Sequence, residues 1–299
     1  MRNINGHSVM LQAHRGDSAQ RPENTMAAFR SAVAHRFDLI ELDPKFTRDN
    51  QCVILHDRTI ARTGRDRDGR CADTPIAEMT LAEARAYEYG GWFGAQFAGE
   101  PLPLLEDALR FAHENHIAIK LDNVIESFTS AQTAILLDVV EKSGAADVTG
   151  FTCTRPDYAA AVTARFPKAT IHYDGAPDED SLRAISGVLK ENPLVVWLRY
   201  PNRQTAWCRT PPASEESAAL VRRMGAKVGL WIIDDENEAA DACARFAPDI
   251  IETAGFIRPD AQDEGSGAEG VLSDLENFSA DPIEAPRREK TPEFAAVSF

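Results

Sequence analysis

The chain reads AHRGDSAQRPENTMAAFRSAVAHRFDLIELDPKFTRDNQCVILHD from residue 13 to residue 57, and three short apolar runs in and just before it end in polar side chains. Apolar runs of this length, bounded by turn residues, are typical of buried strands. In parallel α/β folds, the loops after the carboxyl ends of strands carry ligand-binding and catalytic groups. This stretch therefore predicts strands of a buried sheet with a functional site at one edge.

Five side chains in the stretch suit phosphate chemistry. Glu41 and Asp43 are two residues apart, so on a strand they project from one face. Two buried carboxylates repel each other unless a cation or protons intervene, and all-oxygen ligation favours Mg²⁺ or Ca²⁺. His14 and His56 can each take or give a proton near neutral pH, and the Arg15 guanidinium suits phosphate. Together these residues indicate phosphoryl transfer or phosphodiester cleavage.

The totals narrow the class of protein. With 299 residues, 43% of them hydrophobic, the chain is long enough for a large core. A net charge of −15 argues against general affinity for nucleic acid or anionic membranes. Five scattered cysteines without a C-x-x-C motif are typical of a reducing compartment. The N-terminus has no apolar signal core and no run reaches transmembrane length, so we expect a cytoplasmic protein without integral membrane contact.

Apolar runs alternate with helical segments along most of the chain. The predicted strands are residues 8–13, 38–43, 117–122, 147–152, 169–173, 194–199, 227–233 and 249–253. Such alternation implies a parallel sheet, and eight units imply a closed (β/α)8 TIM barrel. Residues 47–51 are expected to form a turn that sends the chain back along residues 52–55, as a hairpin-like arm that presents His56. Residues 1–8 are expected to be a polar lead-in. His172, inside an apolar run, is expected to be a core residue.

Two segments fall outside this alternation. Residues 58–103 are predicted to be a loop insertion after the second strand, in which Trp92 and Phe93 either line the substrate mouth or pack the glycine-rich loop. Residues 260–299 hold ten acidic and three basic residues and predict an acidic, disordered tail. The expected domains are a barrel over residues 1–259, including the insertion, and the tail.

Three polar residues near the site have open roles. Asn24 can cap the helix predicted after the PENT turn, whose first residue is Pro22. Glu23 and Asn24 are otherwise either structural or part of the site. Asp57 either orients an imidazole or holds its loop.

The motifs HRG, PENT, ELD, the turn TRDN and HD, in this order, resemble the glycerophosphodiester phosphodiesterase family, within the phosphatidylinositol-phospholipase-C-like superfamily. The resemblance is dense over residues 10–60. It implies a TIM-barrel hydrolase of lipid metabolism that cleaves a small phosphodiester to an alcohol and a phosphomonoester. It implies catalytic roles for His14 and His56, phosphate contact by Arg15, and binding of one divalent cation by Glu41 and Asp43.

Residues 120–122 depart from that family's pattern. The family usually shows E-x-K there, with the acid on the metal and the lysine on phosphate, whereas this chain has K-x-D. Because residues two apart share a face of a strand, the exchange keeps one carboxylate and one ammonium facing the site. We expect Asp122 to be the third metal ligand and Lys120 to reach the phosphate. A slipped alignment, or a site with only two protein carboxylates, is the alternative. Asn123 can also serve as a neutral oxygen ligand.

The sequences of the last two predicted strands match the family's motifs only in part. VGLWIID resembles the family's V-x-x-W-T-x-N, so Trp231 is expected to bind substrate, although Ile232 and Asp234 replace the usual threonine and asparagine. IIET replaces the usual I-I-T-D. A sphingomyelinase-D-like lyase that stops at a cyclic phosphate and a non-catalytic phosphodiester-binding barrel are therefore alternatives. The retained histidines and Glu41/Asp43 pair favour catalysis.

Overall fold

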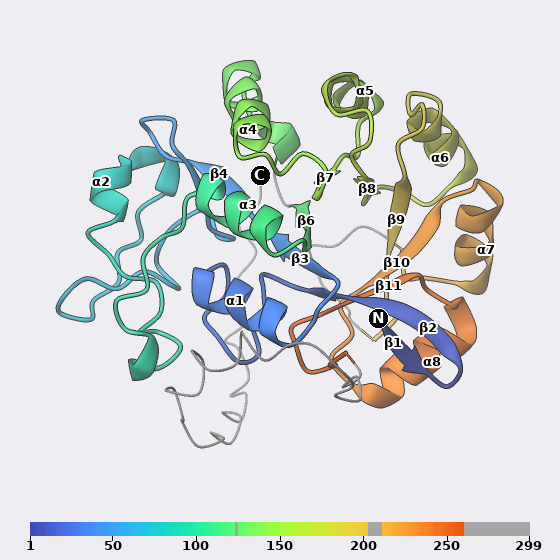
Figure 1. Cartoon of the computed structure of the whole chain (residues 1–299), viewed down its shortest axis with the longest axis horizontal. Coiled ribbons are helices and arrows are strands. Elements are labelled where there is room, and N and C mark those ends of the chain that lie inside the picture. Colours follow the sequence, from blue (N-terminus) through green and yellow to red (C-terminus); the bar gives the residue numbers. More distant parts are fainter. Residues whose placement is uncertain (123–124, 203–210, 260–299) are drawn as a thin grey trace. The chain divides into compact units, whose positions relative to one another are not determined.

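A computed structural model describes residues 1–122, 125–202 and 211–259, and in these residues eight parallel strands close into a barrel (Figure 1). In chain order they are β2 (His7–Ala13), β3 (Leu39–Leu42), β6 (Ala118–Leu121), β7 (Thr149–Thr152), β8 (Ile171–Tyr173), β9 (Leu194–Arg199), β10 (Lys227–Trp231) and β11 (Ile250–Thr253). Pairing of β2 with both β11 and β3 closes the ring. The predicted (β/α)8 barrel is thus confirmed, with a strand in each predicted place.

Helices surround the strands in Figure 1. They are α1 (Met26–Ala34), α3 (Leu105–Glu114), α4 (Ser130–Lys142), α5 (Pro156–Arg165), α6 (Glu179–Ser186), α7 (Glu215–Arg223) and α8 (Glu236–Phe246), and a single turn, α2 (Leu81–Ala84), lies in the insertion. Side-chain oxygens of Thr25, Thr129 and Ser214 accept backbone N–H bonds at the start of their helices. No helix in the described ranges is both long and apolar enough to cross a membrane.

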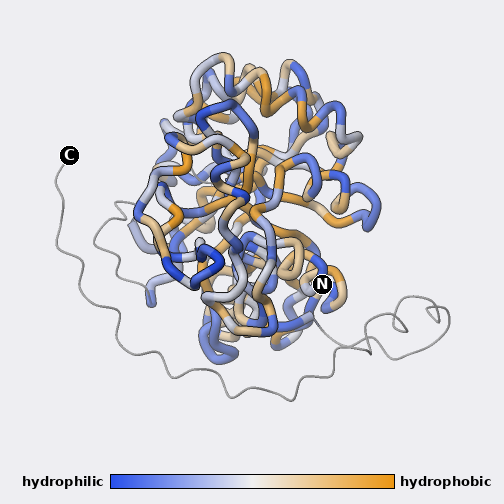
Figure 2. The backbone as a smooth tube through the Cα atoms, turned by 90° about the vertical axis from the view of Figure 1, so that its left-hand side faces the viewer, coloured by the Kyte–Doolittle hydropathy of each residue, from blue (hydrophilic) through white to orange (hydrophobic). Residues whose placement is uncertain are grey.

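The barrel interior has an apolar layer and a polar layer. Leu39, Val195, Trp197 and Ile250 pack together inside the ring, separately from the larger core between strands and helices. The residues two positions later on β3 and β11, Glu41 and Glu252, project from the same inward face. The polar layer therefore lies one step nearer the carboxyl ends of the strands. In Figure 2 much of the backbone near the centre of the molecule is hydrophobic, and many outer segments are hydrophilic.

His172 belongs to this interior packing. Its Nδ1 accepts a 3.0 Å hydrogen bond from the indole Nε1 of Trp197, and both residues are buried. Burial lowers the pKa of His172 to about 3, so its ring is neutral near pH 7. The expectation that His172 is a core residue agrees with this geometry.

The second strand is followed by the predicted hairpin arm. β4 (Pro44–Phe46) pairs antiparallel with β5 (Cys52–Ile54), outside the barrel sheet. Residues 58–103 build a small core of their own on this arm, with Val53, Leu55, Ile60, Ile76, Met79, Ala84, Tyr89 and Leu102. Trp92 donates its indole N–H to the Tyr89 carbonyl at 2.9 Å and meets Phe93 edge to face. These contacts favour loop packing for the two aromatic residues.

The N-terminal residues form a strand of their own. The polar lead-in is wrong, because β1 (Arg2–Ile4) pairs antiparallel with β2. Asn5 and Gly6 form its turn with positive φ angles of 51° and 87°, which Asn-Gly pairs favour in tight hairpins. The predicted acidic tail, residues 260–299, lies outside the described residues.

Close packing inside the barrel can be tested at Gly229. A Cβ added there would lie 2.5 Å from the buried ring of Trp197. We expect Gly229→Ala to lower the free energy of unfolding by about 1–3 kcal/mol, measured by chemical denaturation, because overpacking strains the core. The same substitution in a Trp197→Phe background should cost less, since the smaller ring leaves room for the methyl group. An equal cost in both backgrounds would contradict this packing.

Candidate functional site

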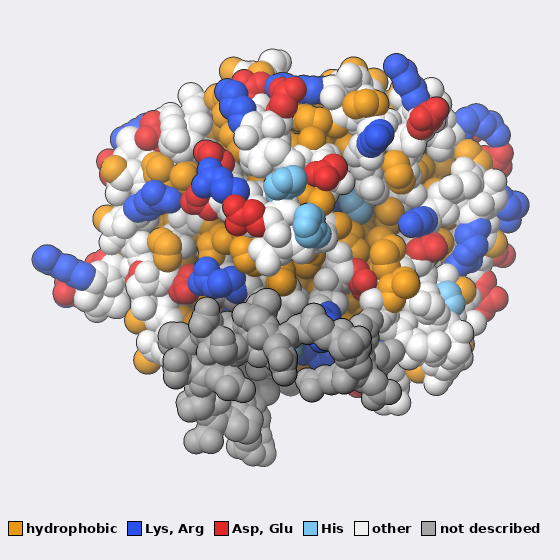
Figure 3. Space-filling view, in the orientation of Figure 1, with side chains coloured by type: hydrophobic (Ala, Val, Ile, Leu, Met, Phe, Trp, Pro, Cys, Tyr) orange, Lys and Arg blue, Asp and Glu red, His pale blue; other side chains and the backbone are white. Residues whose placement is uncertain are grey.

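The carboxyl ends of β2, β3, β6 and β11 bring the predicted residues together. His14 directly follows β2, Glu41 lies on β3 and Lys120 on β6. The register places Glu41 beside Lys120 and Glu252 beside Gln12. Figure 3 shows histidine side chains near the middle of one face, with acidic and basic side chains close by. The barrel therefore places these groups at one end, where such folds carry their chemistry.

Arg15 of the HRG turn contacts three carboxylates. The backbone N–H of Arg15 donates to Glu41 Oε2 at 2.7 Å, and Arg15 Nη1 donates to Glu23 Oε1 at 2.8 Å. Arg15 Nε lies 3.6 Å from Asp43 Oδ2. Gly16 has φ +78°, and a Cβ there would lie 2.7 Å from the Cβ of Ala28. Glycine at this position therefore allows the turn to pack against α1.

Asn24 serves the site rather than the helix. The expectation that Asn24 caps α1 is wrong, since Thr25 is the N-cap and its Oγ1 accepts from the Ala28 N–H. The Asn24 Nδ2 instead donates to Asp43 Oδ2 at 2.7 Å. Asn24 is buried and adopts a φ of +55°, which asparagine tolerates better than most residues. The PENT turn thus fixes the orientation of the Asp43 carboxylate.

Lys120 and Asp122 form an ion pair at the K-x-D position. Lys120 Nζ donates to Asp122 Oδ2 at 2.8 Å and lies 3.8 Å from Glu252 Oε2. Its ammonium also lies 4.5 Å above the ring of Trp197. Glu252 Oε2 accepts a further hydrogen bond from Gln12 Nε2. Lys120 is buried, so its positive charge balances acids of the polar layer. Contact of Lys120 with phosphate stays a prediction.

Glu41 is a buried carboxyl close to three other acids. Burial, together with repulsion from Asp43, Asp122 and Glu252, raises its pKa well above the usual value. Facing carboxylate oxygens of this kind fit a hard divalent cation in chemistry and in charge. Within the described ranges, however, no three His, Cys, Asp or Glu side chains converge closely enough to hold a metal ion. Instead, the Asp43 carboxylate accepts a hydrogen bond from the Asn24 amide, and the Asp122 carboxylate accepts one from Lys120. Asn123 lies outside the described residues.

His56 is held by an ion-pair network from the insertion. Its Nδ1 lies 2.7 Å from Asp57 Oδ1. Arg62 donates to both oxygens of Asp57, at 2.7 and 3.1 Å, and to both oxygens of Glu23, at 2.7 and 2.8 Å. Burial alone would raise the pKa of both carboxyls, yet these hydrogen bonds hold the pKa of Asp57 and of Glu23 below the ordinary values. Arg62 therefore connects the supports of His56 and Arg15.

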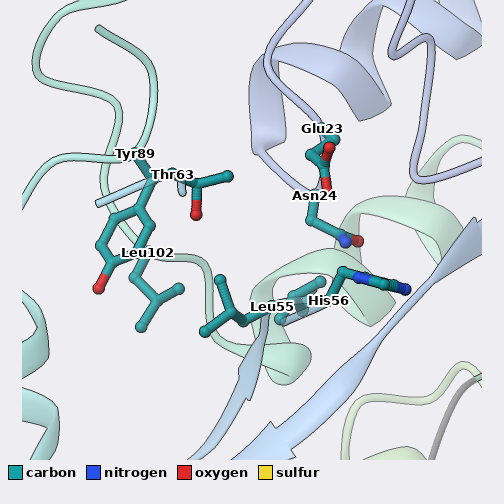
Figure 4. A pocket seen from close by; sticks show the side chains of 8 residues that line it. Glu23, Asn24, Leu55, His56, Thr63, Tyr89 and Leu102 are labelled. Carbon is teal, nitrogen blue, oxygen red and sulfur yellow. The ribbon is translucent and has the colours of Figure 1, made fainter. Parts of the chain in front are cut away.

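A small cavity lies behind His56. It measures about 10 Å³ and is lined by Glu23, Asn24, Ile54, Leu55, His56, Thr63, Tyr89 and Leu102. Figure 4 shows Glu23 and Asn24 on one side of it, and Thr63, Tyr89 and Leu102 on the other. A space of this size is enough for roughly one water molecule. The cavity is lined both by residues of the site and by residues of the insertion core. It is too small for a substrate.

Trp231 is the last residue of β10, at the carboxyl end of the strand. It is half-buried and packs against the apolar layer inside the barrel. Its indole Nε1 is buried and has no hydrogen-bond partner among the described residues. Substrate contact by Trp231 stays a prediction.

Sequence reasoning missed four charged residues near the site. Glu252 and Asp174 lie on or just after strands, and burial raises the pKa of each. The signal was the same as for Glu41, an acid at the carboxyl end of an apolar run. Arg62 and Lys45 had no comparable signal, because one lies in an irregular insertion and the other in a short arm.

Comparisons with known proteins identify the family to which the chain belongs. The family described as "Glycerophosphoryl diester phosphodiesterase family" matches residues 14–253. The chain is 40% identical over 106 residues to YhdW of Bacillus subtilis, covering 36% of this chain and 41% of that protein. It is 36% identical over 114 residues to the glycerophosphodiester phosphodiesterase of Caldanaerobacter subterraneus, covering 38% of this chain and 44% of that one. The matched stretches thus span under half the length of these relatives.

Solved structures show the same fold. An Oleispira antarctica phosphodiesterase, solved in complex with the product sn-glycerol-3-phosphate, superposes with a TM-score of 0.68 at 21% identity. The match covers 82% of this chain and 93% of the other. At this identity the likeness establishes the barrel fold.

The Arg62 network predicts a pH-dependent loss of stability. Arg62→Gln leaves two partly buried carboxylates without their shared cation. After discounting for its 41% exposed side chain, we expect a loss of about 1–2 kcal/mol at pH 7. Because Arg62 lowers the pKa of Glu23 and Asp57, this stabilisation is present above pH ~4 and disappears as pH falls and the acids protonate.

Urea unfolding of both proteins from pH 7 down to pH 3 measures this difference. Arg110→Gln is the matched control, because Arg110 makes one exposed pair with Glu106 and its loss should cost under about 0.5 kcal/mol. A difference for Arg62→Gln that stays constant with pH would show that the ion pairs are not its source.

Proposed function

Because the chain belongs to the glycerophosphoryl diester phosphodiesterase family, which matches residues 14–253, we propose that it hydrolyses a glycerophosphodiester or a related small phosphodiester to an alcohol and a phosphomonoester. The observation that carries this proposal is that Arg15, directly after His14, contacts Glu41 and Asp43 at the carboxyl end of the barrel. The relative from Caldanaerobacter has this activity in its name. The Oleispira structure holds a glycerol phosphate product.

Glu41, Asp43 and Asp122 would hold one divalent cation, Mg²⁺ or Ca²⁺. The mutual repulsion that raises the pKa of Glu41 supports this part of the proposal. When bound, such an ion would stabilise negative charge on the phosphoryl oxygens. Asn24 and the backbone N–H of Arg15 orient two of the carboxylates toward this role.

His14 and His56 would share the proton transfers. The contact of His56 Nδ1 with the Asp57 carboxylate favours the tautomer with the proton on Nδ1. One imidazole takes the proton of the attacking hydroxyl group, and the other gives a proton to the leaving alkoxide oxygen. With a glycerophosphodiester, the neighbouring glycerol hydroxyl attacks phosphorus first, the P–O bond to the alcohol breaks, and water then opens the cyclic phosphate.

Substrate contacts would come from three further side chains. Arg15, held by Glu23, presents a permanent positive charge to the phosphate. Lys120 would add a second charge from the polar layer, and Trp231 would form an apolar wall. A small phosphodiester is thus the proposed partner, and the cytoplasmic location stays a prediction.

The function is tested with a panel of soluble glycerophosphodiesters and sugar phosphodiesters, followed by phosphorus NMR with Mg²⁺, with Ca²⁺ and with a chelator. We expect monoester product that depends on the divalent ion. Turnover in His14→Ala and in His56→Ala should fall by about 10²–10⁴-fold. His113→Ala is the control, because His113 lies on the exposed side of α3.

Three outcomes would contradict parts of this proposal. No turnover of any diester would exclude hydrolysis of these substrates. A cyclic phosphate that persists as the end product would indicate a lyase. Near-full activity of either histidine variant would exclude the paired acid–base mechanism.

A further inference from the structure

Lys45 on β4 is a buried cation without a direct partner. The residue is only 8% exposed. Among the residues that the structure describes, its ammonium makes no hydrogen bond, no ion pair within 4 Å and no contact over an aromatic ring. The other two cations of the site differ, since Arg15 is paired with Glu23 and Lys120 with Asp122. A largely buried lysine without a direct partner in the chain has donors available for an anionic ligand.

Lys45 lies beside the catalytic groups rather than in the apolar core. Asp43 and Lys45 are two residues apart on an extended segment and so share a face. Phe46 takes the opposite face and packs edge to face on Phe128 at 4.9 Å. The Leu55 N–H donates to the Asp43 carbonyl, which continues the hairpin pairing toward His56 and Asp57.

Four charged side chains act on the ammonium group of Lys45. They belong to Asp43, Asp57, Arg15 and Glu41, all members of the site or its support. Three of these four are negative, yet none forms a direct ion pair with Lys45. The ammonium is therefore held in the field of the site with its three donors available.

We propose that Lys45 binds a non-bridging oxygen of the substrate's phosphoryl group, next to Arg15. This inference rests on the proposed function and adds a residue to it. Arg15 and Lys120 already have protein partners, so Lys45 supplies the cation whose main partner is the substrate. A lysine acts here as a compact point charge that follows the phosphoryl oxygen through the reaction.

The test compares Lys45→Gln, which keeps length and polarity, with Lys45→Arg, which keeps the charge, and with Lys168→Gln as an exposed control. Calorimetry measures binding of sn-glycerol 3-phosphate and of uncharged glycerol, and kinetics give KM and kcat for the best diester. We expect Lys45→Gln to weaken glycerol phosphate binding and raise KM by about 10- to 100-fold. Lys45→Arg should recover most of the loss, and glycerol binding should not change.

A thermal melt separates this role from a structural one. Removal of a buried unpaired charge should leave Tm unchanged or raise it, whereas loss of a structural lysine would lower it. Unchanged glycerol phosphate affinity in Lys45→Gln, or a lowered Tm, would overturn the inference.

The two proposals can fail separately. If the wild type turns over diesters and Lys45→Gln does so equally well, only the role of Lys45 is wrong. If the wild type turns over no diester but binds glycerol phosphate through Lys45, only the hydrolase function is wrong. Absence of both turnover and glycerol phosphate binding overturns both.

Discussion

Repulsion among buried carboxylates at the end of the barrel is the constraint on which the site depends. Glu41 faces the charges of Asp43, Asp122 and Glu252, and its pKa is raised by burial and by this repulsion. Such a cluster is stable only if cations or protons compensate it. Lys120 supplies one positive charge from within the layer, close to Asp122 and Glu252. The proposed divalent cation would compensate the remaining negative charge. The same carboxylates would therefore affect both the stability of the fold and the binding of the ion.

The rest of the fold keeps these groups in place. The apolar layer around Trp197 fills the barrel interior next to the acids. The acidic side chains therefore have no space to move further into the barrel. The PENT turn orients Asp43 through Asn24, and the insertion supplies Arg62, which holds both Glu23 and Asp57. The insertion therefore supports the site as well as covering its arm. Variation in its sequence is expected to act on proton transfer through this network.

The sequence predicts the barrel well because each strand is an apolar run followed by a turn, and this local pattern survives in the fold. It predicts Glu41 and Asp43 for the same reason. It does not predict the partners of Asn24, Arg62 or Lys45, since these depend on which loops meet in space. Glu252 follows the same pattern as Glu41, an acid late in an apolar strand, but the end of β11 departs from the expected motif, so the motif does not predict Glu252 as a site residue.

The most direct test of the account is calorimetric titration of Mg²⁺ and Ca²⁺ into the purified chain and into Glu41→Gln. Glutamine keeps the shape of Glu41 but removes the charge at the centre of the cluster. We expect one ion to bind per wild-type chain, and binding to weaken by at least about 10-fold in Glu41→Gln. Equal binding by both proteins, or no binding by either, would contradict the claim that the buried carboxylates are organised around a cation.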